Sequence, residues 1–287
     1  MTRFFLKIFG LTTLFVPHLS TGSLAILDIS PPPLERKINQ KEIEKKVSAK
    51  SFLIFDVTSS SIILAKNAHQ KLPVASLNKL MSTLLILEEN TPYQVVKISK
   101  QAAATLPAKM WLLENEKIYV NNLLRGLLIA SANDAAVALA TFNAGSINSF
   151  VEKMNIRAKN LGLKNSHFQN PHGLDSKNNF SSSYDIAFLA SFLWQKKHPL
   201  WGRFFQETVK TKEITVKSTN QQIEHPLHNT NELLNSNLPI FGIKTGTTDL
   251  AGQCLVTLFR KNKREILIVV LNSQDRFLDT KILFNSI

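Results

Sequence analysis

Ser76 and Lys79 are the first residues whose types and spacing suit a chemical reaction. Pro73 and the capping ability of serine predict a helix that begins at Ser76, and Lys79 then lies one turn later on the same face, ~5–6 Å away. A serine hydroxyl is a weak nucleophile that needs an adjacent base. A lysine amine can be that base only when burial or a neighbouring cation lowers its pKa. The pair alone is weak evidence, because a capping serine followed by a lysine also occurs by chance.

Two further polar segments follow along the chain. Ser131-Ala-Asn133 interrupts a helical stretch, where the serine hydroxyl can relay a proton and the asparagine amide can hold a substrate carbonyl or the lysine. Lys244-Thr-Gly-Thr247 ends a predicted strand, and its glycine allows a peptide to lie alongside as an added strand. The backbone N–H groups of Thr247 and Ser76 can form an oxyanion hole. Each segment alone also fits an ordinary helix cap or turn.

The elements that must position these residues form three blocks. β-rich runs at 51–57 and 61–65 predict a hairpin, helical periodicity dominates the middle, and strand patterns return near the C-terminus. The predicted helices cover residues 76–89, 121–130, 133–140, 147–161, 183–194 and 277–284, and the later strands cover 213–217, 241–245, 252–260 and 264–271. The order predicts an α/β (α+β) fold, with an antiparallel sheet built from both termini and flanked by helices. A helical subdomain at about 76–200 is inserted, and the active site lies between the two parts.

Composition excludes several classes of protein. The net charge is +13, but the positive residues are scattered and no nucleic-acid-binding motif is present, so we expect no nucleic-acid partner. The single cysteine, Cys254, excludes an internal disulfide and lies in an apolar strand, where we expect a buried, inert thiol. His225 and His228 flank a proline and have no acidic or thiol partner at ligand spacing, so no metal is expected. No cofactor-binding motif is found either.

The N-terminus is typical of an export signal. Arg3 and Lys7 precede an apolar stretch at 8–16, and Ser23-Leu-Ala25 is a small-x-small cleavage site. We expect residues 1–25 to be a signal peptide or an N-terminal anchor, and the working protein to be secreted or periplasmic. Residues 26–50 are then a linker with a short helix, and residues 51–287 are a single catalytic domain.

In the order Ser-x-x-Lys, Ser-x-Asn, Lys-Thr-Gly, the three segments are much more specific than any one of them. From about residue 51 to the C-terminus the sequence resembles the serine D-alanyl-D-alanine carboxypeptidases, the low-molecular-mass penicillin-binding proteins. The resemblance extends over residues 73–81, 127–138, 170–175, 229–234, 242–248 and 251–256. Two positions depart from it in a small way: Asn78 and Ala132 stand where the family often has Thr and Gly.

The resemblance implies a reaction through an acyl-enzyme, with peptidoglycan stem peptides as substrate. Ser76 attacks the carbonyl between two D-alanines with Lys79 as general base, and water later hydrolyses the acyl-enzyme. Ser131, with Lys244 as a second candidate, passes the proton to the leaving D-alanine. β-Lactam antibiotics, which mimic the dipeptide, are expected to acylate the same serine. The implied substrate-binding residues are Asn133, Lys244, Thr245, Thr247 and Arg276.

The C-terminal part of the sequence carries two further expectations. Arg276 suits the terminal carboxylate of the substrate because a guanidinium binds carboxylates in bidentate geometry, although an arginine that caps the last helix is the alternative. The sequence ends eleven residues later. We therefore expect neither the second β-rich domain nor the C-terminal anchor of many relatives, and membrane association only through the N-terminus.

Three other functions remain open. A D,D-endopeptidase that cuts peptidoglycan cross-links uses the same residues, and a non-catalytic peptidoglycan- or penicillin-binding protein keeps the same fold. A class A β-lactamase needs a deacylating glutamate on a separate loop. The nearest match, Glu232-Leu-Leu-Asn235, lies only twelve residues before Lys244, which is too close for such a loop.

Overall fold

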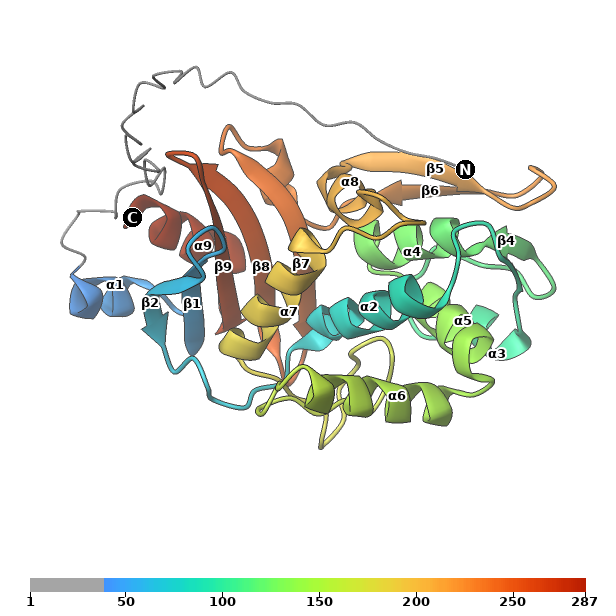
Figure 1. Ribbon diagram of the computed structural model, residues 1–287, viewed down its shortest axis with the longest axis horizontal. Helices are drawn as coiled ribbons and strands as arrows, with labels where there is room; N and C mark the ends of the chain where they lie inside the picture. Colours follow the sequence, from blue (N-terminus) through green and yellow to red (C-terminus); the bar gives the residue numbers. More distant parts are fainter. Residues whose placement is uncertain (1–38) are drawn as a thin grey trace, which may run out of the picture. The chain divides into compact units, whose positions relative to one another are not determined.

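The computed structural model describes residues 39–287 (Figure 1). The predicted signal segment at 1–25 and residues 26–38 of the predicted linker lie outside the described residues. Within residues 39–287, no helix combines the length and the hydropathy that a membrane span requires.

A five-stranded antiparallel sheet, in the order β2-β1-β9-β8-β7, forms the centre of the fold. Its strands are β1 (Ser51–Asp56), β2 (Ser61–Lys66), β7 (Ile240–Thr248), β8 (Gly252–Lys261) and β9 (Arg264–Ser273). The N-terminal hairpin therefore pairs with the C-terminal strands, and the predicted fold class is confirmed. β7, which carries the Lys-Thr-Gly segment, is an edge strand.

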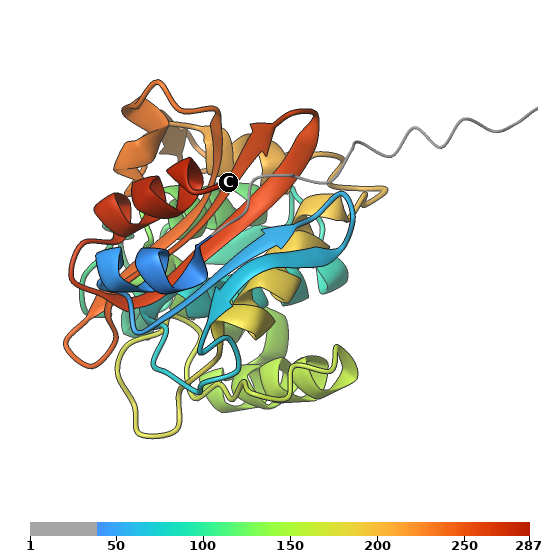
Figure 2. The ribbon, with the colours of Figure 1, turned by 90° about the vertical axis from the view of Figure 1, so that its left-hand side faces the viewer.

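Helices cover both faces of the sheet, because alternate residues of its inner strands are apolar on each side. On β9, Leu267, Val269 and Leu271 join one buried cluster, whereas Ile266, Ile268 and Val270 join another. The second cluster includes residues of α1 (Gln40–Lys46) and α9 (Arg276–Asn285), which lie side by side against the sheet in Figure 2. The first includes residues of α7 (Ser183–Gln195) and the helical region.

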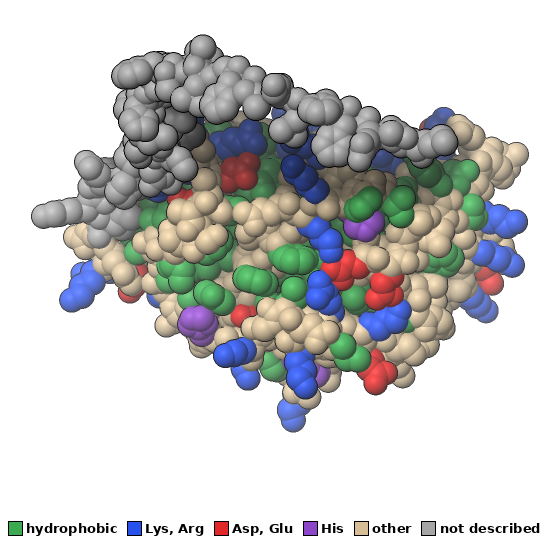
Figure 3. Space-filling model, in the orientation of Figure 1, with side chains coloured by type: hydrophobic (Ala, Val, Ile, Leu, Met, Phe, Trp, Pro, Cys, Tyr) green, Lys and Arg blue, Asp and Glu red, His purple; other side chains and the backbone are tan. Residues whose placement is uncertain are grey.

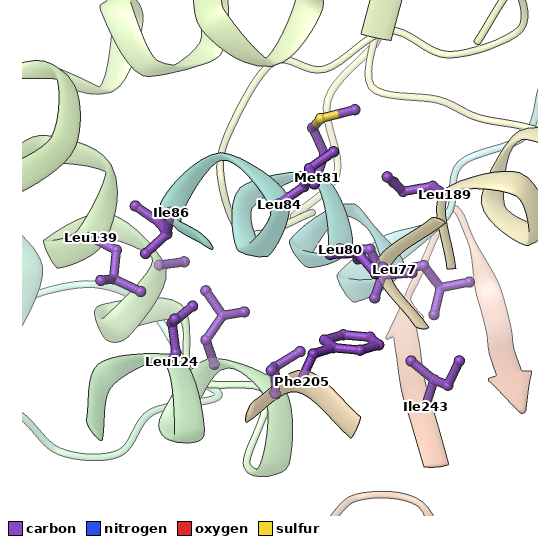
Figure 4. Close-up of a cluster of buried hydrophobic side chains, with 14 of the residues drawn as sticks. Leu77, Leu80, Met81, Leu84, Ile86, Leu124, Leu139, Leu189, Phe205 and Ile243 are labelled. Carbon is purple, nitrogen blue, oxygen red and sulfur yellow. The ribbon is translucent and has the colours of Figure 1, made fainter. Parts of the chain in front are cut away.

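The helical region is built around α2 (Lys79–Glu89), in which nine consecutive residues from Lys79 to Leu87 are buried. Figure 4 shows α2 side chains, among them Leu80 and Leu84, in one cluster of buried hydrophobic residues with Leu124 and Phe205 from neighbouring elements. The surrounding helices are α3 (Lys100–Ala103), α4 (Val120–Ile129), α5 (Asn133–Ala144), α6 (Ile147–Asn160) and α8 (Phe204–Lys210). α2 is therefore held on every side, which fixes the position of Lys79 at its first residue.

Some elements differ from the sequence expectation. The strand predicted at 213–217 forms as β5 (Glu213–Lys217), but it pairs with β6 (Glu224–His228) in a separate hairpin and not with the main sheet. β6 was not predicted, because it contains Pro226, a residue that disfavours strands. α3, α8 and the pair β3 (Val95–Lys97) and β4 (Lys117–Tyr119) were also missed, since such short elements leave little periodicity.

One buried carboxylate joins the two ends of the described chain. Asp279 of α9 accepts hydrogen bonds from Ser48 N, Ser48 Oγ, Ala49 N and Ser273 Oγ at 2.6–2.9 Å. We expect Asp279→Ala to lower the free energy of unfolding by about 3 kcal/mol, because these donors would stay buried without an acceptor. Urea denaturation measures the change, with the exposed Asp249→Ala as control. A loss below about 0.5 kcal/mol would contradict the assigned role.

Candidate active site

The candidate nucleophile lies in a 3₁₀ turn, η1 (Ala75–Asn78), directly before α2. This corrects the expectation that Ser76 caps the helix: the residue at the cap of the turn is Val74, and no side chain there makes a capping hydrogen bond. The Ser76 side chain is half-buried, and its Oγ instead lies 2.8 Å from Lys79 Nζ. A hydroxyl that is not used for capping is available for chemistry.

Lys79 is fully buried, and three oxygens surround its amine. Lys79 Nζ lies 2.8 Å from Ser76 Oγ, 2.7 Å from Asn133 Oδ1 and 2.7 Å from the carbonyl oxygen of His172. Burial and then the positive charge of Lys244 hold the Lys79 pKa well below its usual value of 10.5. A neutral amine has two N–H groups and one lone pair. In the neutral form, the two carbonyl oxygens can take the two N–H groups, and the lone pair can then face the Ser76 hydroxyl.

Asn133 connects this lysine to the opposite wall of the site. It is the first residue of α5, and its Nδ2 donates to the carbonyl oxygens of Leu106 and Pro107 at 3.1 and 2.8 Å. These two acceptors fix the orientation of the amide, so that its oxygen faces Lys79 Nζ. The Asn133 side chain therefore positions the amine and the 106–107 loop together.

Ser131 lies in the turn between α4 and α5, as predicted from the interrupted helical pattern. It is buried and has a φ of 58°, an uncommon conformation for serine. Ala132, and not Ser131, is the N-cap residue of α5. Within residues 39–287, the Ser131 hydroxyl makes no hydrogen bond to Ser76, Lys79 or Lys244, and the turn is linked to the site through Asn133, which contacts Lys79.

The Lys-Thr-Gly segment lies against the nucleophile turn. A Cβ atom on Gly246 would lie 2.8 Å from the backbone nitrogen of Ser76, a contact that only glycine avoids. Lys244 is buried, and burial together with the charge of Arg276 lowers its pKa to about 7. Lys244 Nζ donates to the Thr245 carbonyl oxygen at 3.2 Å.

Arg276 reaches this segment from the start of α9. Its Nη1 donates to Thr247 Oγ1 at 2.5 Å and to the Gly246 carbonyl oxygen at 3.1 Å. Asp275, and not Arg276, caps the helix, because its carboxylate accepts from two backbone N–H groups of the first turn. The alternative of a helix-capping arginine is therefore wrong. On the other side, Thr245 Oγ1 lies 2.5 Å from Thr230 Oγ1.

The segment 170–175, which carries part of the family resemblance and in which His172 was expected to pack near the cleft, connects the two halves of the site. Gly173 has a φ of 90°, and a Cβ atom there would lie 2.0 Å from the Ala75 carbonyl oxygen. Asp175 accepts from Thr248 Oγ1 at 2.6 Å, beyond the end of the Lys-Thr-Gly segment. His172 offers its backbone carbonyl to Lys79, and burial beside that lysine lowers the imidazole pKa to about 4. A backbone acceptor leaves no signal in the residue types.

The other polar candidates are structural in character. His225 is buried and bonds Glu116 Oε1 through Nε2 at 2.7 Å and the Met110 carbonyl through Nδ1 at 2.8 Å. Glu116 is an acidic partner that the sequence spacing did not reveal. In residues 39–287, no group of three or more His, Cys, Asp or Glu side chains is arranged to hold a metal ion. Cys254 is buried as predicted, and burial raises its pKa to about 11. Lys and Arg side chains are dispersed among other types on the uncovered part of the face in Figure 3.

Comparisons with known proteins place the chain in a family. The family model for D-alanyl-D-alanine carboxypeptidases, peptidase S11, matches residues 37–275. D-alanyl-D-alanine carboxypeptidase DacF of Bacillus subtilis is 32% identical over 255 residues, covering 87% of this chain and 64% of that protein. D-alanyl-D-alanine endopeptidase of Pseudomonas aeruginosa is 28% identical over 276 residues, covering 94% of this chain and 84% of that protein.

A solved structure agrees with the sequence matches. Penicillin-binding protein 6B of Escherichia coli superposes with a TM-score of 0.74 and 31% identity, covering 90% of this chain and 80% of that one. The chain spans 64% to 66% of the length of three of its curated relatives. The antiparallel sheet and the buried lysine beside a serine agree with a family model that matches most of the sequence. The chain therefore belongs to the peptidase S11 family of D-alanyl-D-alanine carboxypeptidases.

Proposed function

We propose that the protein is a serine-type D-Ala-D-Ala carboxypeptidase that removes the terminal D-alanine from peptidoglycan stem peptides. The observation that carries the proposal is the contact of 2.8 Å between Lys79 Nζ and Ser76 Oγ, made by an amine whose pKa burial lowers well below its usual value of 10.5. A neutral amine with its lone pair toward a hydroxyl is the arrangement that general-base activation of serine requires.

The proposed reaction has two steps. Ser76 Oγ bonds to the carbonyl carbon between the two D-alanines while its proton passes to Lys79 Nζ. The C–N bond then breaks, and the leaving nitrogen takes a proton relayed by Ser131, which yields free D-alanine and an ester on Ser76. Water adds to this ester, the serine recovers its proton, and the shortened peptide leaves. No metal or cofactor takes part in this scheme.

Binding of the substrate is assigned to two walls of the site. Asn133 and the edge of β7 hold the peptide, and the backbone N–H groups of Ser76 and Thr247 stabilise the oxyanion. The close packing of Gly246 on the Ser76 backbone supports this pairing. Lys244, Thr245, Thr247 and Arg276 form the pocket for the terminal carboxylate, where the two cations and two hydroxyls meet.

The same chemistry defines the proposed partners and location. Stem peptides ending in D-Ala-D-Ala are the substrates, and β-lactams are covalent inhibitors that acylate Ser76. Because peptidoglycan lies outside the cytoplasm, we assign the working domain, residues 51–287, to that side. The segment 1–25 is then an export signal or an N-terminal membrane anchor.

The test is a digestion of purified peptidoglycan and of a soluble stem pentapeptide. Free D-alanine is expected from both substrates with the wild-type protein and from neither with Ser76→Ala. If the wild type releases no D-alanine although the protein is folded, the proposed activity is wrong.

A D,D-endopeptidase is the second candidate. It is favoured by one observation: the chain is 28% identical to the D-alanyl-D-alanine endopeptidase of Pseudomonas aeruginosa over 94% of its own length. The same digestion separates the two activities. Conversion of cross-linked dimers to monomers without free D-alanine would identify the endopeptidase.

The depressed pKa of Lys244 predicts a pH effect. As the pH rises through about 7, Lys244 loses its charge, and kcat/KM for a peptide with a free carboxylate is expected to fall. Burial also lowers the pKa of Lys79, so the Lys244→Arg variant is needed to assign the fall to Lys244. A pH profile of kcat/KM checks the fall. Lys244→Arg, which keeps its charge, is expected to move the fall of kcat/KM to higher pH. An unchanged profile would contradict the assignment of the fall to Lys244.

A further inference from the structure

The shortest contact between uncharged side chains at the site is that between two hydroxyls. Thr230 Oγ1 lies 2.5 Å from Thr245 Oγ1, at the short end of the range for O–H···O hydrogen bonds. Thr245 is 3% exposed and Thr230 is half-buried. Thr230 was not among the predicted site residues, and the mechanism above gives it no role.

The backbone of Thr230 is held in place independently of its hydroxyl. Its N–H donates to the carbonyl oxygen of Ile129, the last residue of α4, at 3.2 Å. The preceding Asn229 donates from Nδ2 to the Thr211 carbonyl at 2.9 Å and accepts from Asn231 N at 2.9 Å. The Thr230 side chain is therefore presented to Thr245 by a fixed segment.

The two threonines of β7 differ in how their protons are set. Thr247 Oγ1 accepts from the Arg276 guanidinium, which can only donate, so the Thr247 proton is free for another acceptor. Between Thr245 and Thr230 either hydroxyl can donate. If Thr245 gives its proton to a substrate carboxylate, Thr230 must donate to Thr245.

We propose that Thr230 is a positioning residue for the carboxylate pocket: its hydroxyl donates to Thr245 and thereby directs the Thr245 proton to the substrate. The inference rests on the proposed function, because it needs an anionic substrate terminus. Thr230 then donates a hydrogen bond to Thr245 Oγ1, as Arg276 does to Thr247 Oγ1, and each bond leaves the threonine proton for another acceptor. A hydroxyl that accepts one hydrogen bond is a stronger donor in the next, so the chain from Thr230 to the carboxylate is mutually reinforcing.

Three variants test the proposal. Thr230→Val keeps the shape and the backbone N–H but removes the hydroxyl, and Thr230→Ser keeps the hydroxyl. Thr215→Val, at an exposed position of β5, is the matched control. Each is assayed on a stem pentapeptide ending in D-Ala-D-Ala and on the same peptide with a C-terminal amide, which has no carboxylate.

Thr230→Val is expected to lower kcat/KM about three- to tenfold on the acid peptide, mainly through KM, and to change the amide peptide less than about twofold. Thr230→Ser restores the wild-type value, and Thr215→Val has no effect. An equal loss on both peptides, no loss on either, or a failure of serine to rescue would overturn the proposal.

The outcome can be separated from a failure of the proposed function. If the wild type releases no D-alanine, the acylation rates by benzylpenicillin and by its methyl ester replace the two peptides. Slower acylation of Thr230→Val by the acid alone still supports the role of Thr230. Equal rates for variant and wild type with the acid reject it.

Discussion

Replacing Lys79 by methionine is expected to lower kcat/KM for D-alanine release by about 10³-fold, within the usual range for the loss of a general base. Methionine has a similar length and stays apolar in a fully buried site, but it has no lone pair that can take the Ser76 proton. The rate of D-alanine release and the rate of acylation by penicillin are both expected to fall, because both begin with attack by the same hydroxyl.

A folding control makes the result for Lys79 interpretable. Lys79→Met leaves Asn133 Oδ1 and the His172 carbonyl oxygen without their donor, so some loss of stability is expected, and urea denaturation checks that the variant is folded under the assay conditions. A folded Lys79→Met protein that keeps more than about a tenth of the wild-type acylation rate would contradict the role of the lysine.

Replacing Arg276 by glutamine is expected to give the second-largest effect. The guanidinium is half-buried beside Thr247, and hydrogen bonds between charged groups are worth more than neutral ones. We expect kcat/KM to fall about 10- to 100-fold on a peptide with a free carboxylate and much less on its C-terminal amide.

The same substitution has a second expected result. Arg276 contributes to the low pKa of Lys244, so Arg276→Gln is expected to raise that pKa and move the alkaline fall of kcat/KM to higher pH. Steady-state kinetics on both peptides across pH measures both effects. Equal losses on the acid and the amide peptide would show that the arginine does not bind the carboxylate.

The fold was predictable where the local pattern and the tertiary environment agree. β9 is apolar in consecutive positions because helices cover both of its faces, and such a run between turn residues predicts a buried strand. The hairpin at 51–66 and the long helices were predicted for the same reason. β6 was not, since Pro226 occupies an exposed position of a two-stranded hairpin, where a missing N–H costs little.

The candidate site was predictable only as far as residue types carry the information. Ser76 and Lys79 follow from one short segment and Asn133 from a second, and the structure brings Lys79 within hydrogen-bond distance of both Ser76 and Asn133. The carbonyl of His172 contributes through the backbone, which any residue supplies. Thr230 contacts Thr245 across fifteen positions of the chain, and no local pattern marks a hydroxyl that acts through another hydroxyl.

The central claim is that a neutral amine at Lys79 activates the Ser76 hydroxyl, and mass spectrometry after treatment with penicillin tests it most directly. The wild-type protein is expected to gain the mass of one penicillin, with the adduct on the peptide that contains Ser76, whereas Ser76→Ala and Lys79→Met gain none on the same time scale. Absence of an adduct on the folded wild type, or an adduct on another residue, would contradict the account.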